Sequence, residues 1–279
     1  MLLHADPSQV AGLSRFFKTG PGQYGEGDKF LGIKVPVTRE VVKEYWWSVG
    51  RKELEACMGS EYHEVRLAAL LTLVEIFKHC GKKAGARTKT KTEQQTVSNP
   101  EEEPFTKEEC IEFYLCHTDS INNWDLVDLT CYPLLGEWLL DKDRSLLYKL
   151  ARYGKTIWEQ RIGIVSTMTF IRHGQLDDTF AISDILLYHP HDLIHKAVGW
   201  LLREAGKKDK LRLEAYLQGV YVIKGDCNGD SDKPDQSRQL SQLPDDRLVR
   251  YRTMPRTMLR YAIEKFPETE RQAYLSGKV

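Results

Sequence analysis

The 279-residue sequence has no long apolar run, no pattern of a secretory leader and no pair of cysteines with C-x-x-C spacing. The longest apolar run, at 67–74, is interrupted by Thr72 and is far shorter than the roughly 18 residues that a membrane helix needs. The N-terminal segment MLLHADPSQV has no basic region followed by an apolar one, so we expect no secretory signal. The six cysteines are then expected to be reduced thiols. We therefore expect an intracellular, cytoplasmic protein with no membrane partner.

The sequence also has no net charge, because 40 Lys and Arg residues balance 40 Asp and Glu residues. This balance argues at first against a nucleic-acid partner, whose usual indication is a strongly basic domain. The charge is uneven, however: residues 142–161, 195–212 and 247–261 carry +4, +4 and +5. A zero sum can therefore conceal a basic face. The alternative is that these runs are ordinary solvated faces of surface helices.

Signals of β-strands and hairpin turns are few, whereas helical periodicity is frequent. We predict a helix around 65–77 that is buried between neighbours, and further helices at 108–117, 124–140, 144–153, 157–172, 177–188, 191–205, 210–218 and 255–266. Two polar segments, at about 82–104 and 225–243, are expected to be flexible insertions. The remaining chain is expected to form one helical domain over 1–279.

A faint repeat runs through four of the predicted helices. Each has a polar residue followed by small and apolar residues, with spacings of 62, 33 and 35 residues between the polar positions Arg66, Asp128, Arg161 and Lys196. Without the first insertion the longest spacing falls to about 40, a period typical of HEAT-like helix pairs. The pattern favours an all-α, HEAT-like repeat α-solenoid with a concave basic face over a bundle without repeats.

Several motifs in order carry a resemblance to a known family. They are Phe30-Leu-Gly-Ile-Lys-Val-Pro36, Asn123-Trp-Asp-Leu-Val-Asp128, Ile157-Trp-Glu-Gln-Arg161 and Lys196-Ala-Val-Gly-Trp-Leu-Leu-Arg-Glu204. From about Phe16 to Tyr274 the chain resembles the AlkD-like DNA alkylation repair family of HEAT-repeat DNA glycosylases. The resemblance implies a helical solenoid that holds duplex DNA and releases N3- or N7-alkylated purines.

The resemblance also implies roles for individual residues. Trp124 and Asp128 match the tryptophan and catalytic aspartate of the family, Arg161 its arginine, and Trp200 its second active-site tryptophan. Asn123 stands where some members carry another tryptophan, and Tyr24 is a candidate for the N-terminal aromatic residue. Weaker candidates for contacts with the DNA backbone are Lys196, Arg203 and Arg256.

The residue types suit this chemistry. An alkylated purine is cationic and already a good leaving group, so one carboxylate can stabilise the sugar cation and position water. Trp124 and Asp128 are four residues apart and therefore share one face of a helix. An indole face attracts a cation by roughly 0.5–2 kcal/mol. No lysine nucleophile is indicated, so we predict a monofunctional glycosylase.

Other constellations are weaker. His191 and His195 have a spacing that can hold zinc, but no third ligand accompanies them, and we predict neither a metal nor a cofactor. The predicted partner is double-stranded DNA with alkylated purines, bound by a monomer. Two alternatives stay open at this point, a DNA-binding HEAT scaffold without catalysis and a HEAT protein-interaction module.

Overall fold

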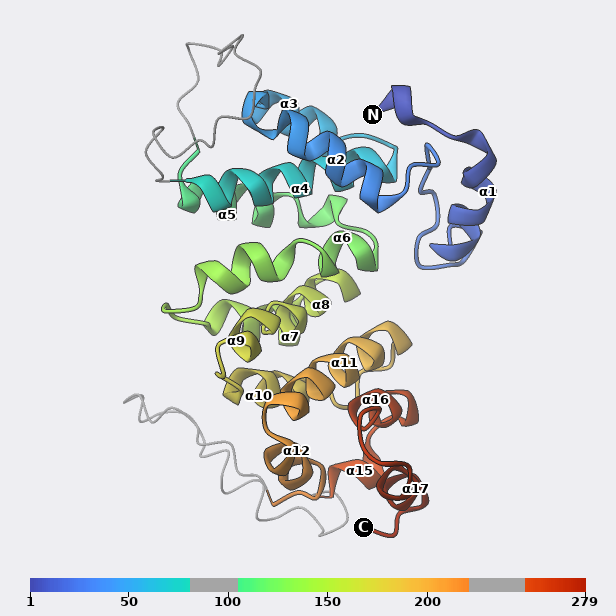
Figure 1. Ribbon diagram of the computed structural model, residues 1–279, viewed down its shortest axis with the longest axis vertical. Coiled ribbons are helices and arrows are strands. Elements are labelled where there is room, and N and C mark those ends of the chain that lie inside the picture. Colours follow the sequence, from blue (N-terminus) through green and yellow to red (C-terminus); the bar gives the residue numbers. More distant parts are fainter. Residues whose placement is uncertain (81–104, 221–248) are drawn as a thin grey trace. The chain divides into compact units, whose positions relative to one another are not determined.

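The described part of the chain is built from helices. The computed structural model describes residues 1–80, 105–220 and 249–279, and its elements are shown in Figure 1. Within these ranges the only β-type pairing is an isolated bridge between Lys29 and Tyr62. The predicted all-helical class is therefore confirmed. The two predicted insertions lie outside the described residues.

The chain divides into two compact units, Met1–Asp141 and Lys142–Val279. The prediction of a single domain over 1–279 stays a prediction. None of the helices in the described ranges is long and apolar enough to cross a membrane.

Helix α4, His63–His79, is the centre of the first unit. The helices α2 (Val35–Tyr45), α3 (Arg51–Met58), α5 (Lys107–Cys116) and α6 (Trp124–Asp128) all pack against it. Its residues 69–74 are all buried, in keeping with a helix that has partners on several sides. The predicted helix around 65–77 is thus confirmed.

A buried carboxylate fixes the loop between α1 (Pro7–Phe16) and α2. The side chain of Glu64 accepts hydrogen bonds of 2.9–3.1 Å from the backbone N–H groups of Leu31, Gly32 and Ile33. Gly32 has φ +86°, and a Cβ there would lie 1.9 Å from the carbonyl oxygen of Asp6. Only glycine can therefore occupy this position without moving the chain.

The helix predicted over 124–140 is interrupted. It ends as α6 at Asp128 and resumes as a π-helical segment, Tyr132–Gly136. Pro133 has no N–H to donate to the carbonyl four residues earlier, which breaks the regular ladder. The hydroxyl of Thr130 bonds instead to the carbonyl of Leu126. The prediction of one continuous helix was wrong for this reason.

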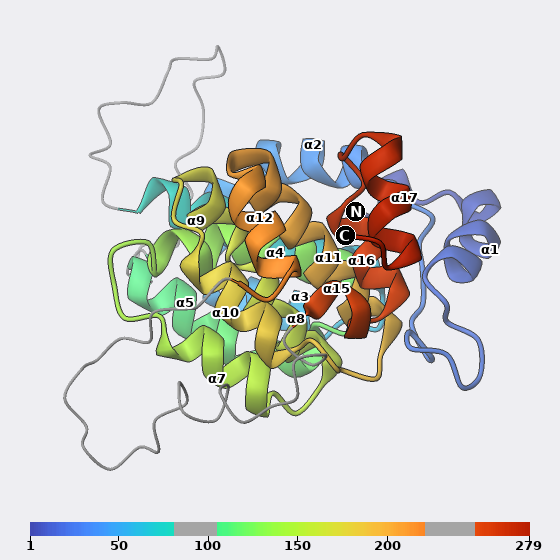
Figure 2. The same ribbon diagram turned by 90° about the horizontal axis from the view of Figure 1, so that it is seen from below.

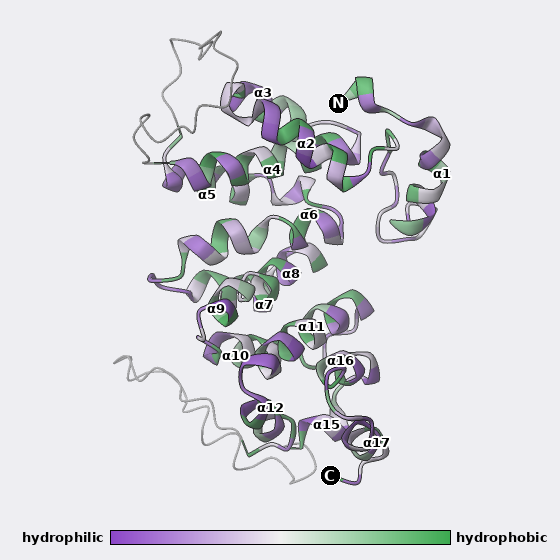
Figure 3. Cartoon of the chain, in the orientation of Figure 1, coloured by the Kyte–Doolittle hydropathy of each residue, from purple (hydrophilic) through white to green (hydrophobic). Residues whose placement is uncertain are grey.

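The second unit contains two central helices, α8 (Ile157–Val165) and α11 (Asp192–Lys208). The helix α7 (Ser145–Tyr153) packs on α8, and α11 contacts α16 (Arg256–Ala262), beside which it lies in Figures 1 and 2. Hydrophobic and hydrophilic residues mix along α11 in Figure 3, as expected for a helix with packed and exposed sides. The remaining helices are α9 (Met168–Arg172), α10 (Asp177–Ile185), α12 (Lys210–Leu217), α15 (Arg250–Thr253) and α17 (Glu268–Ser276).

The helix predicted over 157–172 is also divided, between α8 and α9. The hydroxyls of Ser166 and Thr167 donate to the carbonyls of Ile162 and Ile164, at 2.7 Å in both cases. Such bonds compete with the helical ladder and favour a bend.

Two glycines of the repeat pattern lie where neighbouring helices approach each other closely. A Cβ on Gly163 of α8 would lie 2.8 Å from backbone atoms of Leu147 and Ala151 in α7. A Cβ on Gly199 of α11 would lie 2.5 Å from the carbonyl oxygen of Met258 in α16. The pattern thus reports where two helix backbones approach each other.

Candidate functional site

The first group of predicted site residues lies on α6. Asn123 caps this helix, because its Oδ1 accepts a hydrogen bond of 2.9 Å from the N–H of Trp124. Its Nδ2 donates to the carbonyl of Phe17 at 3.3 Å. Trp124 and Asp128 are both partly exposed and stand one turn apart, on the same side of the helix. Asn123 is fully buried, so its role is to hold the helix start rather than to face a ligand.

Aromatic rings from the N-terminal segment surround Trp124. The indole stacks on Phe17 with ring centroids 5.4 Å apart, and Phe16 meets it edge-on at 5.7 Å. Phe16 is 60% exposed, which is unusual for so large an apolar side chain beside a polar site. The structure thus adds Phe16 to the candidate residues, whereas Tyr24 lies partly exposed in the loop after α1. In the sequence, Phe16 could have been suggested by its place in the Phe16-Phe17 pair, where the resemblance to the family begins.

A buried phenol, that of Tyr114, lies near Asp128. Tyr114 of α5 is fully buried, and burial, followed by the nearby Cys131 and then Asp128 charges, raises the pKa of its hydroxyl well above the ordinary value. Tyr114 therefore stays neutral and adds no second negative charge beside Asp128.

A buried ionic cluster lies behind the aromatic rings. His63 Nδ1 is 3.0 Å from Asp28 Oδ2, and His63 Nε2 is 2.9 Å from Asp125 Oδ2. The Arg66 guanidinium bonds to Asp28 and, at 3.0 Å, to the side-chain oxygen of Asn122. Sequence reasoning missed this cluster, whose members come from three separate parts of the chain.

The second group of predicted residues lies in the second unit, chiefly on α11. Lys196, Trp200 and Arg203 are spaced by four and three residues and so form one stripe along the helix. Lys196 pairs with Asp192 of the same helix at 2.7 Å. Arg203 pairs with Glu204 at 3.1 Å and with Glu264. The structure therefore brings these three residues together.

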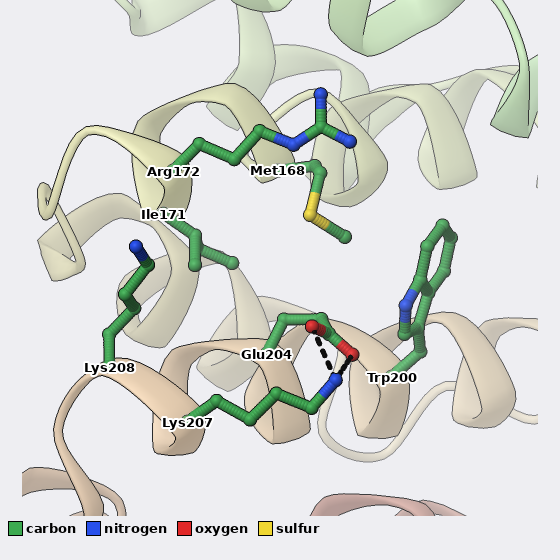
Figure 4. A pocket seen from close by; sticks show the side chains of 7 residues that line it. All are labelled: Met168, Ile171, Arg172, Trp200, Glu204, Lys207 and Lys208. Carbon is green, nitrogen blue, oxygen red and sulfur yellow. Dashed lines mark hydrogen bonds and ion pairs between the residues drawn. The ribbon is translucent and has the colours of Figure 1, made fainter.

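Trp200 faces an open hollow of about 450 Å³ between α11 and α9. In Figure 4 its indole and the thioether of Met168 point toward this hollow, whose other lining residues are Ile171, Arg172, Glu204, Lys207 and Lys208. The Glu204 carboxylate holds Lys207 at 2.7 Å. Trp200 is thus a partly exposed side chain and not a core residue.

The two remaining arginines differ in burial. Arg161 of α8 is buried, and its guanidinium donates to the carbonyl of Leu193 in the first turn of α11. Arg256, the first residue of α16, is exposed and donates to the carbonyl of Leu275 at 2.6 Å. Arg161 therefore contributes to packing between helices, whereas Arg256 lies at the surface.

Several cations of the three basic stretches form ion pairs within the second unit. These pairs include Arg144–Asp178, Lys196–Asp192, Arg203–Glu264, Lys207–Glu204, Lys210–Glu270, Arg212–Asp177 and Arg250–Asp184. Within the described residues, the exposed Arg152, Lys155, Lys208 and Arg260 make no ion pair. The formal charge of these stretches therefore overstates their free positive charge, because acids on the same helix or on neighbouring helices balance part of it.

His189 and His191 lie just before the start of α11. His191 is the N-cap, and its Nδ1 accepts a hydrogen bond of 3.2 Å from the N–H of Leu193. His189 Nε2 lies 2.8 Å from the side-chain oxygen of Gln160. In the described parts of the chain no group of three His, Cys, Asp or Glu side chains is arranged to hold a metal ion.

Fold and sequence together place the chain among all-helical repeat proteins. A family model described as "DNA alkylation repair enzyme" matches residues 1–266, and the chain belongs to this family. It is similar in structure to a predicted DNA alkylation repair enzyme from Enterococcus faecalis, with 15% identity, a TM-score of 0.59 and coverage of 95% of this chain and 98% of that one. At this identity the similarity shows the helical repeat fold. No curated protein matches the chain.

Proposed function

We propose that the chain is a monofunctional DNA N-glycosylase that hydrolyses the N-glycosidic bond of cationic N3- or N7-alkylated purines in duplex DNA. The observation that carries this proposal is the Trp124–Asp128 pair, an indole and a carboxylate one helical turn apart in a chain of the DNA alkylation repair enzyme family. We propose that the protein works inside the cell, in the compartment that contains the DNA.

The reaction needs few groups because the lesion is already positively charged. The bond between C1′ of the sugar and the purine nitrogen breaks with its electrons on the purine, which leaves neutral. Asp128 stabilises the developing sugar cation, orients a water toward C1′ and takes up the proton that the water loses. Trp124 offers a π face to the cationic nucleotide, and the exposed Phe16 adds a second aromatic surface in the same unit. In the proposal Trp200 is a further aromatic contact for the DNA, supplied by the second unit.

Binding of the DNA backbone falls to the second unit. In the proposal Lys196, Arg203 and Arg256 contact phosphates. Arg161, also predicted from the sequence to bind DNA, is buried against the Leu193 carbonyl and instead holds α8 against α11. The stripe of Lys196, Trp200 and Arg203 on one side of α11 supports a continuous contact surface. We propose that a monomer does this without a metal or a cofactor.

The test is release of 7-methylguanine and 3-methyladenine from alkylated duplex DNA in single-turnover reactions. Asp128→Asn keeps the size of the side chain and removes its charge, and we expect it to lower the rate constant by about 10²–10³-fold, as for loss of one preorganised electrostatic group. The matched control is Asp119→Asn, the same change at an exposed residue of the same unit. Control and wild type should release bases equally.

Two results would contradict the proposal. Equal release by wild type and Asp128→Asn would remove the assigned role of Asp128. Salt-sensitive duplex binding without any base release by the wild type would indicate a DNA-binding scaffold instead.

A further inference from the structure

We propose that His63 is a positioning residue for the Trp124–Asp128 pair: its imidazolium donates to Asp28 and Asp125 at once and so locks the start of α6 onto α4 and the N-terminal loop. Its effect on base release rests on the proposed function, whereas its effect on the geometry of α6 does not.

The contacts of His63 require two N–H donors. Both ring nitrogens face carboxylate oxygens, at 3.0 Å for Asp28 and 2.9 Å for Asp125. An ionised carboxylate only accepts hydrogen bonds, so both nitrogens carry a proton when both carboxylates are ionised. His63 is 1% exposed, so its charge has no water to stabilise it and depends on these two partners.

The positive charge of His63 is stabilised by the two carboxylates that it contacts, Asp28 and Asp125. Burial would lower the pKa of His63, but the hydrogen bonds and charges of Asp125 and Asp28 outweigh it and raise the pKa to about 9. For Asp28, burial is outweighed by hydrogen bonds from His63 and Asn122 and by the charge of Arg66, so its pKa is lowered. Glu64, adjacent to His63 on α4, directs its carboxylate to the backbone N–H groups of residues 31–33 instead.

The hydrogen bonds and ring contacts of His63 lead to residues next to Trp124. Asp125 lies directly after Trp124, and its other oxygen accepts a hydrogen bond of 2.9 Å from the N–H of Leu126, within α6. The imidazole ring also packs on Phe17, at a centroid distance of 4.8 Å, and Phe17 is the ring on which Trp124 stacks. His63 therefore holds Trp124 by two routes, one polar and one aromatic.

A helix as short as α6 needs such an external anchor. Its five residues are too few to be stable by themselves, so packing and polar contacts decide its position. A misplacement of about 1 Å at a reacting group costs up to ~10²-fold in rate. We therefore expect loss of the His63 anchor to lower the base-release rate constant by about 10- to 100-fold.

The first experiment measures the environment of the Trp124 side chain, and it can be done whether or not the protein releases bases. The protein is labelled with 5-fluorotryptophan, and the ¹⁹F resonance of Trp124 is assigned by its loss in Trp124→Phe. We expect this resonance to move in His63→Gln at pH 7 and to stay in place in His79→Gln, the same substitution at the exposed end of the same helix. Single-turnover base release is measured on the same proteins and should fall only in His63→Gln.

A second measurement needs no destabilising variant. In wild-type protein the imidazole ¹⁵N shifts of His63 should report a doubly protonated ring through neutral pH, and the Trp124 resonance should change together with them near pH 9. In a separate variant, Asp125→Asn removes the negative charge of the branch to α6 and should move the Trp124 resonance at pH 7.

The outcomes separate the two proposals. An unchanged Trp124 resonance in both His63→Gln and Asp125→Asn would overturn the positioning role, as would a His63 ring that loses its proton near pH 6.5. A moved resonance in protein that releases no base would support the positioning role and contradict the proposed function.

Discussion

The close approach of α7 and α8 makes the substitution Gly163→Ala a sensitive test of the second unit. The new methyl group would lie 2.8 Å from the backbone nitrogen of Ala151 and the backbone oxygen of Leu147. Ordinary contact begins near 3.4 Å, so the two helices must separate by about 0.6 Å. No side-chain rotation can relieve the clash, because both atoms belong to the backbone.

The two contributions to stability have opposite signs. Replacing glycine by alanine inside a helix stabilises it by up to ~1 kcal/mol. Forcing a methyl group into a packed contact costs about 1–3 kcal/mol. We therefore expect Gly163→Ala to lower the free energy of unfolding by about 1–2 kcal/mol.

The assay is urea unfolding followed by circular dichroism at 222 nm, with Gly12→Ala as the matched control. Gly12 lies in α1, and a Cβ there meets no atom within 4 Å. The control should therefore be neutral or more stable than wild type by up to ~1 kcal/mol. A Gly163→Ala protein as stable as wild type, or more stable, would refute the inferred helix contact.

The remaining predictions concern charge. The pKa of His63 is raised to about 9 in the folded protein, so protonation of His63 stabilises the fold by about 3 kcal/mol. This stabilisation is fully present below pH 6.5 and is lost as the pH rises through 9. The free energies of urea unfolding of wild type and His63→Gln should therefore differ at pH 6 and converge near pH 10. Lys196→Ala should weaken duplex binding for all sequences alike and reduce the slope of log K against log salt by about 1, while leaving the unfolding midpoint unchanged because its ion pair is exposed. Arg161→Ala, in contrast, should lower the unfolding midpoint, because its contact with the Leu193 carbonyl is buried; an unchanged midpoint would contradict this placement.

Helices with strong apolar periodicity could be predicted from the sequence, and their interruptions could not. The helices α4 and α7 follow the expected pattern closely. The break after Asp128 depends on Pro133, a local signal that the apolar periodicity of 124–140 outweighed in the prediction. The helix α1 was missed because it has no buried residue, although Asp6 caps it and Pro7 opens it.

The candidate site could be predicted only where its residues are close in sequence. Trp124 and Asp128 lie in one motif, and the helical spacing was sufficient to place them together. The cluster of Asp28, His63 and Asp125 joins residues 35 and 62 positions apart, and no local pattern indicates which carboxylates meet which histidine. The same reason explains the overestimated basic face, because Arg250 finds its partner Asp184 across 66 residues.

The Glu64 carboxylate has a consequence for where an anion can bind. Consecutive backbone N–H groups that converge on one point, with a glycine at positive φ among them, form the kind of concave site that takes a phosphate in many proteins. In this chain residues 31–33 direct their N–H groups at Glu64, so the site is filled from within. An external anion therefore cannot bind these three N–H groups while the Glu64 carboxylate accepts from them.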